Sequence, residues 1–150
     1  MRYFLSYLAL LPAAILCYLP VIHHVRVRKT LLILGGIPLF FFWAAIGGSL
    51  GTRFHVEFYQ WLAPMLPLFA LAFYFSTDLS IWKSISIFLA VGAVFSTIGN
   101  LAVAADALIA PDGSPSLLTI PGCLIFHVMT WGITLAVWYP ATHAARWLLD

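Results

Sequence analysis

Five long apolar blocks, separated by short segments that contain Gly, Pro or charged residues, dominate the pattern of this chain. They cover about residues 3–22, 30–50, 58–75, 85–108 and 117–139. A helix rises 1.5 Å per residue, so each block is close to the ~30 Å needed to cross the hydrocarbon layer of a bilayer. The blocks lack the alternation of barrel strands, which leaves helices as the way to pair every backbone group in lipid. We therefore predict an all-α bundle of five transmembrane helices, forming one domain over residues 1–150.

Glycine and proline residues indicate where these helices end or bend. A Gly-rich segment, 47–51, closes the second block, and a turn cluster, 111–115, precedes the fifth. Proline has no backbone N–H, so a proline inside a block predicts a kink or a helix start. Pro64 and Pro67 make the third block the weakest candidate for a full crossing. The last ten residues, 141–150, are expected to form a short amphipathic tail.

Composition supports lipid as the solvent. Charged residues make up 8% of the 150 positions and hydrophobic residues 63%, whereas soluble domains carry about 25% charged residues. The net charge of +2 is too small to suggest a nucleic-acid partner. Pro12 and the bulky Leu16, Tyr18 and Leu19 leave no small-residue cleavage site for a signal peptide, so the first block is expected to be retained as a span.

The basic residues predict the orientation in the membrane. The loop after the first block contains Arg26, Arg28 and Lys29, and cytoplasmic loops are enriched in such residues. Placing this loop in the cytoplasm puts the N-terminus outside and the C-terminus inside. Five of the seven basic residues are then cytoplasmic. We predict a multi-pass protein of a bacterial cytoplasmic membrane, with Arg26, Arg28 and Lys29 in contact with anionic lipid.

Polar residues inside the fourth block are the first candidates for function, because they are costly in lipid. Gly92, Ser96 and Asn100 recur every four residues on one helix face. They indicate either the polar wall of a ligand pocket or a close helix–helix contact with Asn100 as a hydrogen bonder. Asn100 lies about 9 Å along the axis from Asp106. Together, Asn100 and Asp106 are expected to form a shallow polar site open to the outside.

The fifth block places Cys123, His127, Thr130 and Thr134 on one face. Cys123 and His127 are too few to hold a metal ion, because zinc sites use three or four protein ligands. His127 is expected either to hydrogen bond a neighbouring helix or to contact a ligand in a pH-sensitive way. Our candidate ligand-binding residues are therefore Asn100, Asp106, His127 and Thr134, and we predict no metal site.

Catalytic motifs are missing from the sequence. It contains no phosphate-binding Gly-rich loop, no Gly-x-Ser-x-Gly turn and no His-Glu-x-x-His pair, and Glu57 is its only glutamate. Acid–base catalysis therefore has few residues to use. We predict a protein that is not an enzyme on its own and binds no cofactor.

Three segments carry a resemblance to a known family. They are residues 78–84 leading into 88–91, residues 138–144, and the opening Leu11-Pro12 with its His-His-x-Arg loop. The chain resembles the N-terminal multi-span sensor region of GHKL-type sensor histidine kinases from gut anaerobic bacteria. The resemblance implies a membrane region that detects a signal, with kinase activity in a cytoplasmic part that is absent here. The detected signal is expected to be a peptide or a small molecule.

We therefore expect a non-catalytic sensor region in a two-component signalling system, dimerising with a second copy through helix packing. Two other functions stay open. One is a small membrane transport or substrate-capturing subunit. The other is a tryptophan-rich membrane protein that binds an apolar ligand such as a porphyrin, which the six Trp residues suit in outline.

Overall fold

A computed structural model describes residues 2–54, 58–110 and 118–149, and confirms the all-α prediction for them. The described residues form no strand, apart from one isolated bridge between Val25 and Thr77. Six α-helices and one 3₁₀ turn follow each other along these parts of the chain: α1 (Arg2–Leu8), α2 (Leu11–Tyr18), η1 (Ile22–His24), α3 (Lys29–Phe54), α4 (Phe58–Ser76), α5 (Ile81–Ile109) and α6 (Ile120–Leu149).

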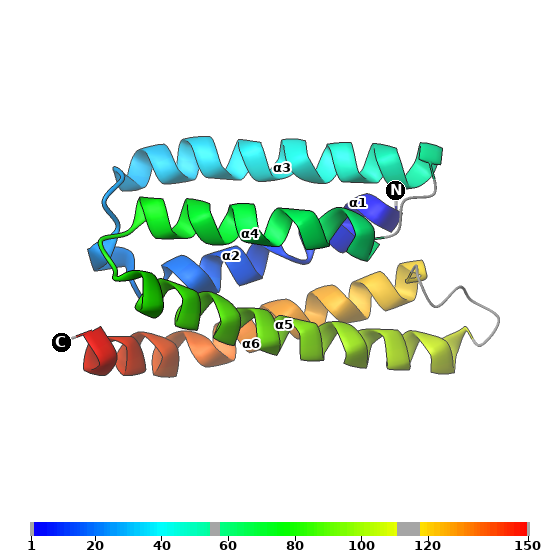
Figure 1. Ribbon diagram of the computed structural model, residues 1–150. Coiled ribbons are helices and arrows are strands. Elements are labelled where there is room, and N and C mark those ends of the chain that lie inside the picture. The colour runs from blue at the N-terminus through cyan, green and yellow to red at the C-terminus, as the bar shows by residue number, and fades with distance from the viewer. Residues whose placement is uncertain (1, 55–57, 111–117, 150) are drawn as a thin grey trace.

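The helices run back and forth along one common axis (Figure 1). Helices α1 and α2 run in one direction, α3 returns, and α4, α5 and α6 continue the alternation. As a result, α1 begins at one end of the bundle and α6 finishes at the other. We call the end that contains residues 22–28 and 76–80 the clasp end, and the opposite end, which contains Phe54, Ile109 and Thr119, the cap end.

Three helical segments are long and apolar enough to cross a membrane: Leu34–Phe54, Ile81–Ile109 and Ile120–Ala144. Two shorter apolar segments, Phe4–Tyr18 and Gln60–Ser76, lie beside them. The structure therefore shows a helical bundle with three segments of membrane-spanning length, a coarser result than the five crossings predicted from the sequence.

The first apolar block, predicted as a span over about residues 3–22, forms two short helices instead of one. Helix α1 ends at Leu8, and Leu10 donates its backbone N–H to the Tyr7 carbonyl at 3.0 Å in a tighter turn before α2 begins. Pro12 has no N–H to give to the Leu8 carbonyl, so a regular helix cannot pass this point with all its bonds made. The block then ends in the 3₁₀ turn of η1.

Two helices extend beyond the apolar blocks that predicted them. Helix α3 continues through the Gly-rich segment 47–51 to Phe54, and α6 passes Pro140 and includes the predicted tail up to Leu149. Helix α5 begins at Ile81, where the Ser80 hydroxyl accepts a bond from the Lys83 N–H. The turn cluster 111–115 lies outside the described residues.

The centre of the bundle is formed around α1 and α2. Tyr7, Ala9 and Val21 are fully enclosed. The Trp43 ring of α3 packs edge-on against Tyr7 at a centroid distance of 5.1 Å and lies parallel to the Trp61 ring of α4 at 6.5 Å. The broken first segment thus occupies the interior, although it is the least regular helical part of the chain.

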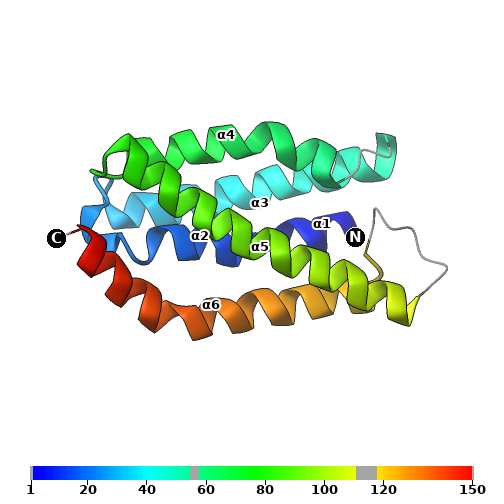
Figure 2. The same ribbon diagram turned by 60° about the horizontal axis from the view of Figure 1, so that its bottom comes forward.

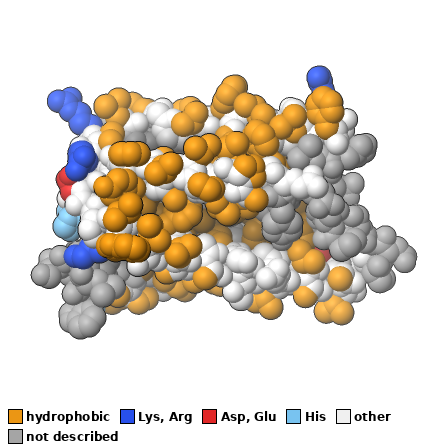
Figure 3. All heavy atoms as spheres, in the orientation of Figure 1, with side chains coloured by type: hydrophobic (Ala, Val, Ile, Leu, Met, Phe, Trp, Pro, Cys, Tyr) orange, Lys and Arg blue, Asp and Glu red, His pale blue; other side chains and the backbone are white. Residues whose placement is uncertain are grey.

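The outer faces of the bundle are apolar. Large hydrophobic side chains such as Leu34, Phe42, Leu124 and Val128 are more than half exposed. In Figure 3 the charged and histidine side chains gather mainly at the clasp end, while the midsection is covered by hydrophobic and uncharged groups. Exposed apolar surface on this scale is unusual for a soluble monomer and is the pattern expected of a protein surrounded by lipid.

Candidate functional site

A line of polar side chains on α6 faces the broken first segment. His127 lies at its middle, with Nε2 3.0 Å from the backbone carbonyl oxygen of Leu5 in α1. A carbonyl only accepts hydrogen bonds, so Nε2 carries the proton and donates it. The bond joins two residues 122 positions apart in the chain, and it ties α6 to α1 in the interior of the bundle.

A second contact lies one helical turn earlier on α6. The Ser6 hydroxyl and the Cys123 sulfur are 3.6 Å apart, and both residues are buried. Cys17 and Cys123 are both buried, and neither forms a disulfide. The adjacent residues Leu5 and Ser6 thus both contact α6, next to the position where the first segment breaks.

Thr130 and Thr134 continue the polar line but bond within their own helix. The Thr130 hydroxyl donates to the His127 carbonyl at 3.0 Å, and the Thr134 hydroxyl donates to the Thr130 carbonyl at 2.7 Å. Both side chains are buried. Such back-bonding threonines tend to bend helices, and Figure 2 shows α6 following a curved path. The hydroxyl hydrogen of Thr134 is therefore already bonded to a carbonyl of its own helix.

Asp106 closes the cap end between α5 and α6. Its carboxylate accepts one bond from the Thr119 backbone N–H at 2.8 Å and another from the Thr119 hydroxyl. The same hydroxyl oxygen accepts the Gly122 N–H at 3.3 Å, as an N-cap does. A negative group at a helix N-terminus is also favoured by the helix dipole. Asp106 therefore serves as part of the cap of α6.

Gly122 makes this close approach of the two helices feasible. A Cβ atom built on Gly122 would lie 2.5 Å from Oδ1 and 2.8 Å from Cβ of Asp106. Gly132, on the same helix, has open space at the equivalent position. The first turn of α6 thus depends on a missing side chain to accommodate the Asp106 carboxylate.

The structure does not bring Asn100 to Asp106. Asn100 is exposed on the outer surface of α5, whereas Asp106 is buried at 7% exposure against α6. Six residues along a helix correspond to about 600° of rotation, so the two side chains leave α5 in different directions. The expected shallow site shared by Asn100 and Asp106 is therefore not formed.

Two surface hollows lie elsewhere. One follows α3 from Phe42 to Phe54, and the other, of about 120 Å³, lies at the clasp end beside Arg26, Tyr74 and Thr77. Neither is lined by Asn100, Asp106, His127 or Thr134. In the described part of the chain, no three His, Cys, Asp or Glu side chains gather as a metal site would require.

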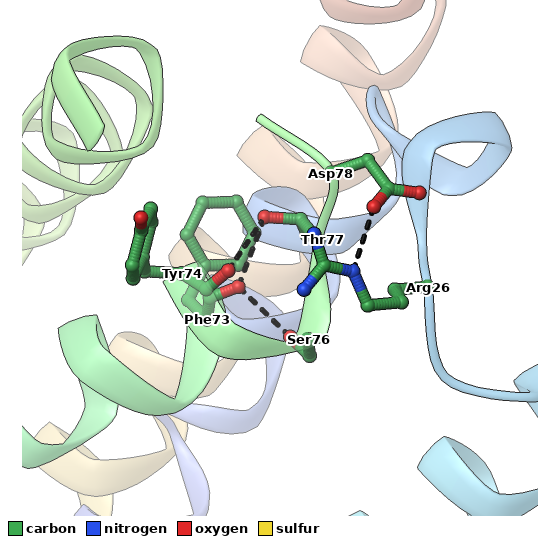
Figure 4. Close-up of polar contacts among 6 residues, drawn as sticks. All are labelled: Arg26, Phe73, Tyr74, Ser76, Thr77 and Asp78. Atoms are coloured by element: carbon green, nitrogen blue, oxygen red, sulfur yellow. Dashed lines mark hydrogen bonds and ion pairs between the residues drawn. The ribbon is translucent and has the colours of Figure 1, made fainter. Parts of the chain in front are cut away.

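At the clasp end, an ion pair and backbone hydrogen bonds join two loops (Figure 4). Arg26 Nε donates to Asp78 Oδ1 at 2.7 Å, and both side chains are more than half exposed. The backbones pair as well, because Arg26 N–H donates to Ser76 O at 2.9 Å and Asp78 N–H donates to His24 O at 2.7 Å. We call this set of contacts the clasp. It joins the α2–α3 loop to the α4–α5 turn.

A part-buried pair of hydroxyls, from Tyr18 and Ser76, supports the clasp from inside the bundle. The Ser76 hydroxyl donates to the Phe73 carbonyl at 2.9 Å. Tyr18 therefore donates its phenolic hydrogen to Ser76 Oγ, 2.9 Å away. Of the three residues predicted to contact lipid headgroups, Arg26 is engaged with Asp78, Arg28 is exposed, and the side chain of Lys29 lies outside the described set.

Comparison with known proteins found no relative of this chain. No protein-family model, no curated protein and no solved structure matches the chain.

Two features of the site were not predicted from the sequence. No sequence pattern marks the Leu5 carbonyl as the partner of His127, because every residue has a backbone carbonyl. Thr119 does have such a pattern, since a threonine followed by Pro121 in the first turn is a recognisable helix start. The pairing of Thr119 with Asp106 could have been suspected from that cap.

Proposed function

We propose that this chain crosses a bacterial cytoplasmic membrane five times, with the cap end outside and the clasp end in the cytoplasm. The alternation of helix directions in Figure 1 supports this arrangement. The basic residues also support it, since Arg26, Arg28 and Lys83 lie at the clasp end and Arg53 at the cap end. Cytoplasmic ends of membrane helices carry the excess of Lys and Arg.

The role we propose is that of a membrane-embedded signal-input region of a histidine-kinase-like receptor, without catalytic activity of its own. The observation that carries this role is the bond from His127 to the Leu5 carbonyl. It joins α6, whose last turns lie at the cytoplasmic end, to a helix that is broken in the interior. A broken helix with few regular bonds can adopt a second packing at low cost, and a signal then shifts the population between the two.

The input would act at the cap end and the output at the last turns of α6. A peptide or small molecule that binds at the outer surface and displaces Thr119 from Asp106 would free the first turn of α6. Helix α6 is continuous from Ile120 to Leu149, so one helix connects a change at its first turn to the cytoplasmic end. The His127 bond sets how far α6 moves relative to α1.

The topology is tested by labelling single cysteines with a membrane-impermeant maleimide in intact cells. Thr52→Cys at the cap end is expected to react, and Arg28→Cys at the clasp end is expected to react only after the cells are opened. Cys17 and Cys123 are buried, so the unmodified chain provides the background. Labelling of Arg28→Cys in intact cells would overturn the proposed orientation.

The signalling role is tested by electron-spin distance measurements in nanodiscs. Spin labels at Arg28→Cys and Ala144→Cys report the position of α6 relative to the α2–α3 loop. We expect two distance populations, whose ratio changes about 3- to 10-fold in His127→Leu, because the lost interhelical bond is worth roughly 0.6–1.5 kcal/mol. His23→Leu, in the exposed loop, is the matched control and leaves the ratio unchanged. A single distance, identical in all variants, would refute the two-packing mechanism while leaving the topology intact.

A further inference from the structure

We propose that α5 is a dimerisation helix, and that a second copy of this chain packs on one seam along its outer face. The seam consists of small or polar residues only. Its members follow each other at alternating steps of four and three positions: Ser86, Ala90, Ala93, Thr97, Asn100, Ala104 and Ala107. The mean step of 3.5 residues is the repeat that keeps one face of a helix against a partner helix in a left-handed pair.

All seven seam residues are exposed, so no helix of the same bundle covers them. The inner face of α5 is formed by other residues, among them Phe95, Ile98 and Ala102, which are buried against neighbouring helices. Figure 2 shows α5 crossing the front of the bundle. A partner can therefore reach the seam without any rearrangement of the fold.

The seam differs from the other outward faces of the bundle. Helices α3 and α6 present large side chains such as Phe42 and Val128, which suit contact with lipid chains. Beside the seam, each one position further along the chain, Val94, Leu101 and Leu108 form an exposed ridge with a spacing of seven. A groove of small residues bordered by a ridge is the shape that lets two helices approach closely.

Asn100 makes a lipid-facing seam costly. It lies nine positions before the end of α5, about 13 Å from that end, which places it within the hydrocarbon layer. No hydrogen bond joins its side chain to any of the described residues. An amide that faces hydrocarbon without a partner is strongly unfavourable, and intramembrane polar groups are normally turned toward protein. The amide therefore requires a hydrogen-bonding partner from outside the bundle.

A second copy provides that partner by symmetry. Copies inserted with the same orientation are related by a two-fold axis along the membrane normal, so Asn100 meets Asn100 of the other copy at the same depth. The amide has both a donor and an acceptor, and it is thus complementary to itself. The same operation sets each groove of small residues against that of the partner. This inference needs membrane insertion but not the signalling role proposed above.

Disulfide cross-linking in native membranes tests the seam. Ala93→Cys and Ala104→Cys introduce thiols within it, and Val128→Cys, 73% exposed as valine on α6, is the matched control. Under mild oxidation we expect dimers of twice the chain mass for both seam variants, several-fold more than for the control. Equal cross-linking of all three, monomers only, or adducts with a different protein would each overturn the proposal.

Energy transfer between labelled copies at increasing lipid dilution measures the strength of association. Asn100→Val is expected to raise the dissociation constant about 3- to 20-fold, the range for one interhelical hydrogen bond in a membrane. Ala93→Phe, which fills the groove, is expected to abolish association, and Val128→Ala to leave it unchanged. Unchanged helicity and tryptophan fluorescence would show that the variants fold. Association that is insensitive to both seam changes would refute the seam.

Discussion

The Asp106 carboxylate of α5 accepts hydrogen bonds from both the backbone N–H and the hydroxyl of Thr119, the residue directly before α6. The two residues are 13 positions apart. An anion supplied by the protein itself thus occupies the N-terminus of α6. Any outside ligand that acts at this end competes with an existing bonded carboxylate.

Replacing Asp106 is expected to destabilise the bundle. Asp106→Ala removes two charge-assisted bonds and leaves the backbone N–H and hydroxyl of Thr119 without their acceptor, at a cost of about 2–3 kcal/mol in the free energy of unfolding. Asp78→Ala is the control, because its ion pair with Arg26 is exposed and contributes no more than about 1 kcal/mol. Tryptophan fluorescence during mixed-micelle denaturation measures both. Equal losses for the two variants would contradict the capping role of Asp106.

Two glycines of α6 are expected to respond in opposite directions to alanine. Gly122→Ala places a methyl group against Asp106, so the helices must separate, which costs about 1–3 kcal/mol. Gly132→Ala enters open space and is expected to stabilise the helix by about 0.5–1 kcal/mol. The same denaturation experiment compares them. Destabilisation of similar size in both would indicate that contact with Asp106 is not the cause.

The clasp is expected to depend on its backbone pairing more than on its ion pair. Arg26→Ala should lower the free energy of unfolding by less than about 1 kcal/mol, because the exposed pair is screened by solvent. The loss should shrink further at high salt. Arg28→Ala, which removes an exposed charge from the same loop, provides the comparison. A large, salt-independent loss in Arg26→Ala alone would show that the guanidinium has another partner.

Much of the helical fold could be predicted from the length and continuity of the apolar blocks in the sequence. Continuous apolar blocks of about 20 residues specify helices, and the observed α4, Phe58–Ser76, nearly coincides with the predicted block 58–75. Pro64 and Pro67 did not interrupt it. Proline residues were a poor guide to where helices end. A helix ends just before Pro12, but Pro121 lies in the first turn of α6 and Pro140 lies inside the same helix. Neighbouring helices decide which of these outcomes is tolerated.

The site was harder to predict, because its partners lie far apart in sequence or belong to the backbone. His127 was expected to bond a neighbouring helix or a ligand, and its bond to Leu5 is of the first kind. The sequence predicts a shared site for Asp106 and Asn100 because they are close along the helix axis. The two side chains leave α5 in different directions, so Asp106 contacts α6 and Asn100 lies on the outer surface. Ligand binding by Asn100, Asp106, His127 and Thr134 stays a prediction.

The position of the broken first segment has a consequence for biosynthesis. Leu5 and Ser6 leave the ribosome more than a hundred residues before their partners on α6, His127 and Cys123. At synthesis rates of about 5–20 residues per second, that interval is roughly 6–25 seconds. During this time α1 can pack against α3, through Tyr7 and Trp43, but its side that faces α6 has no partner. The centre of the bundle is therefore synthesised first and enclosed last, which makes the docking of α6 the step that completes assembly.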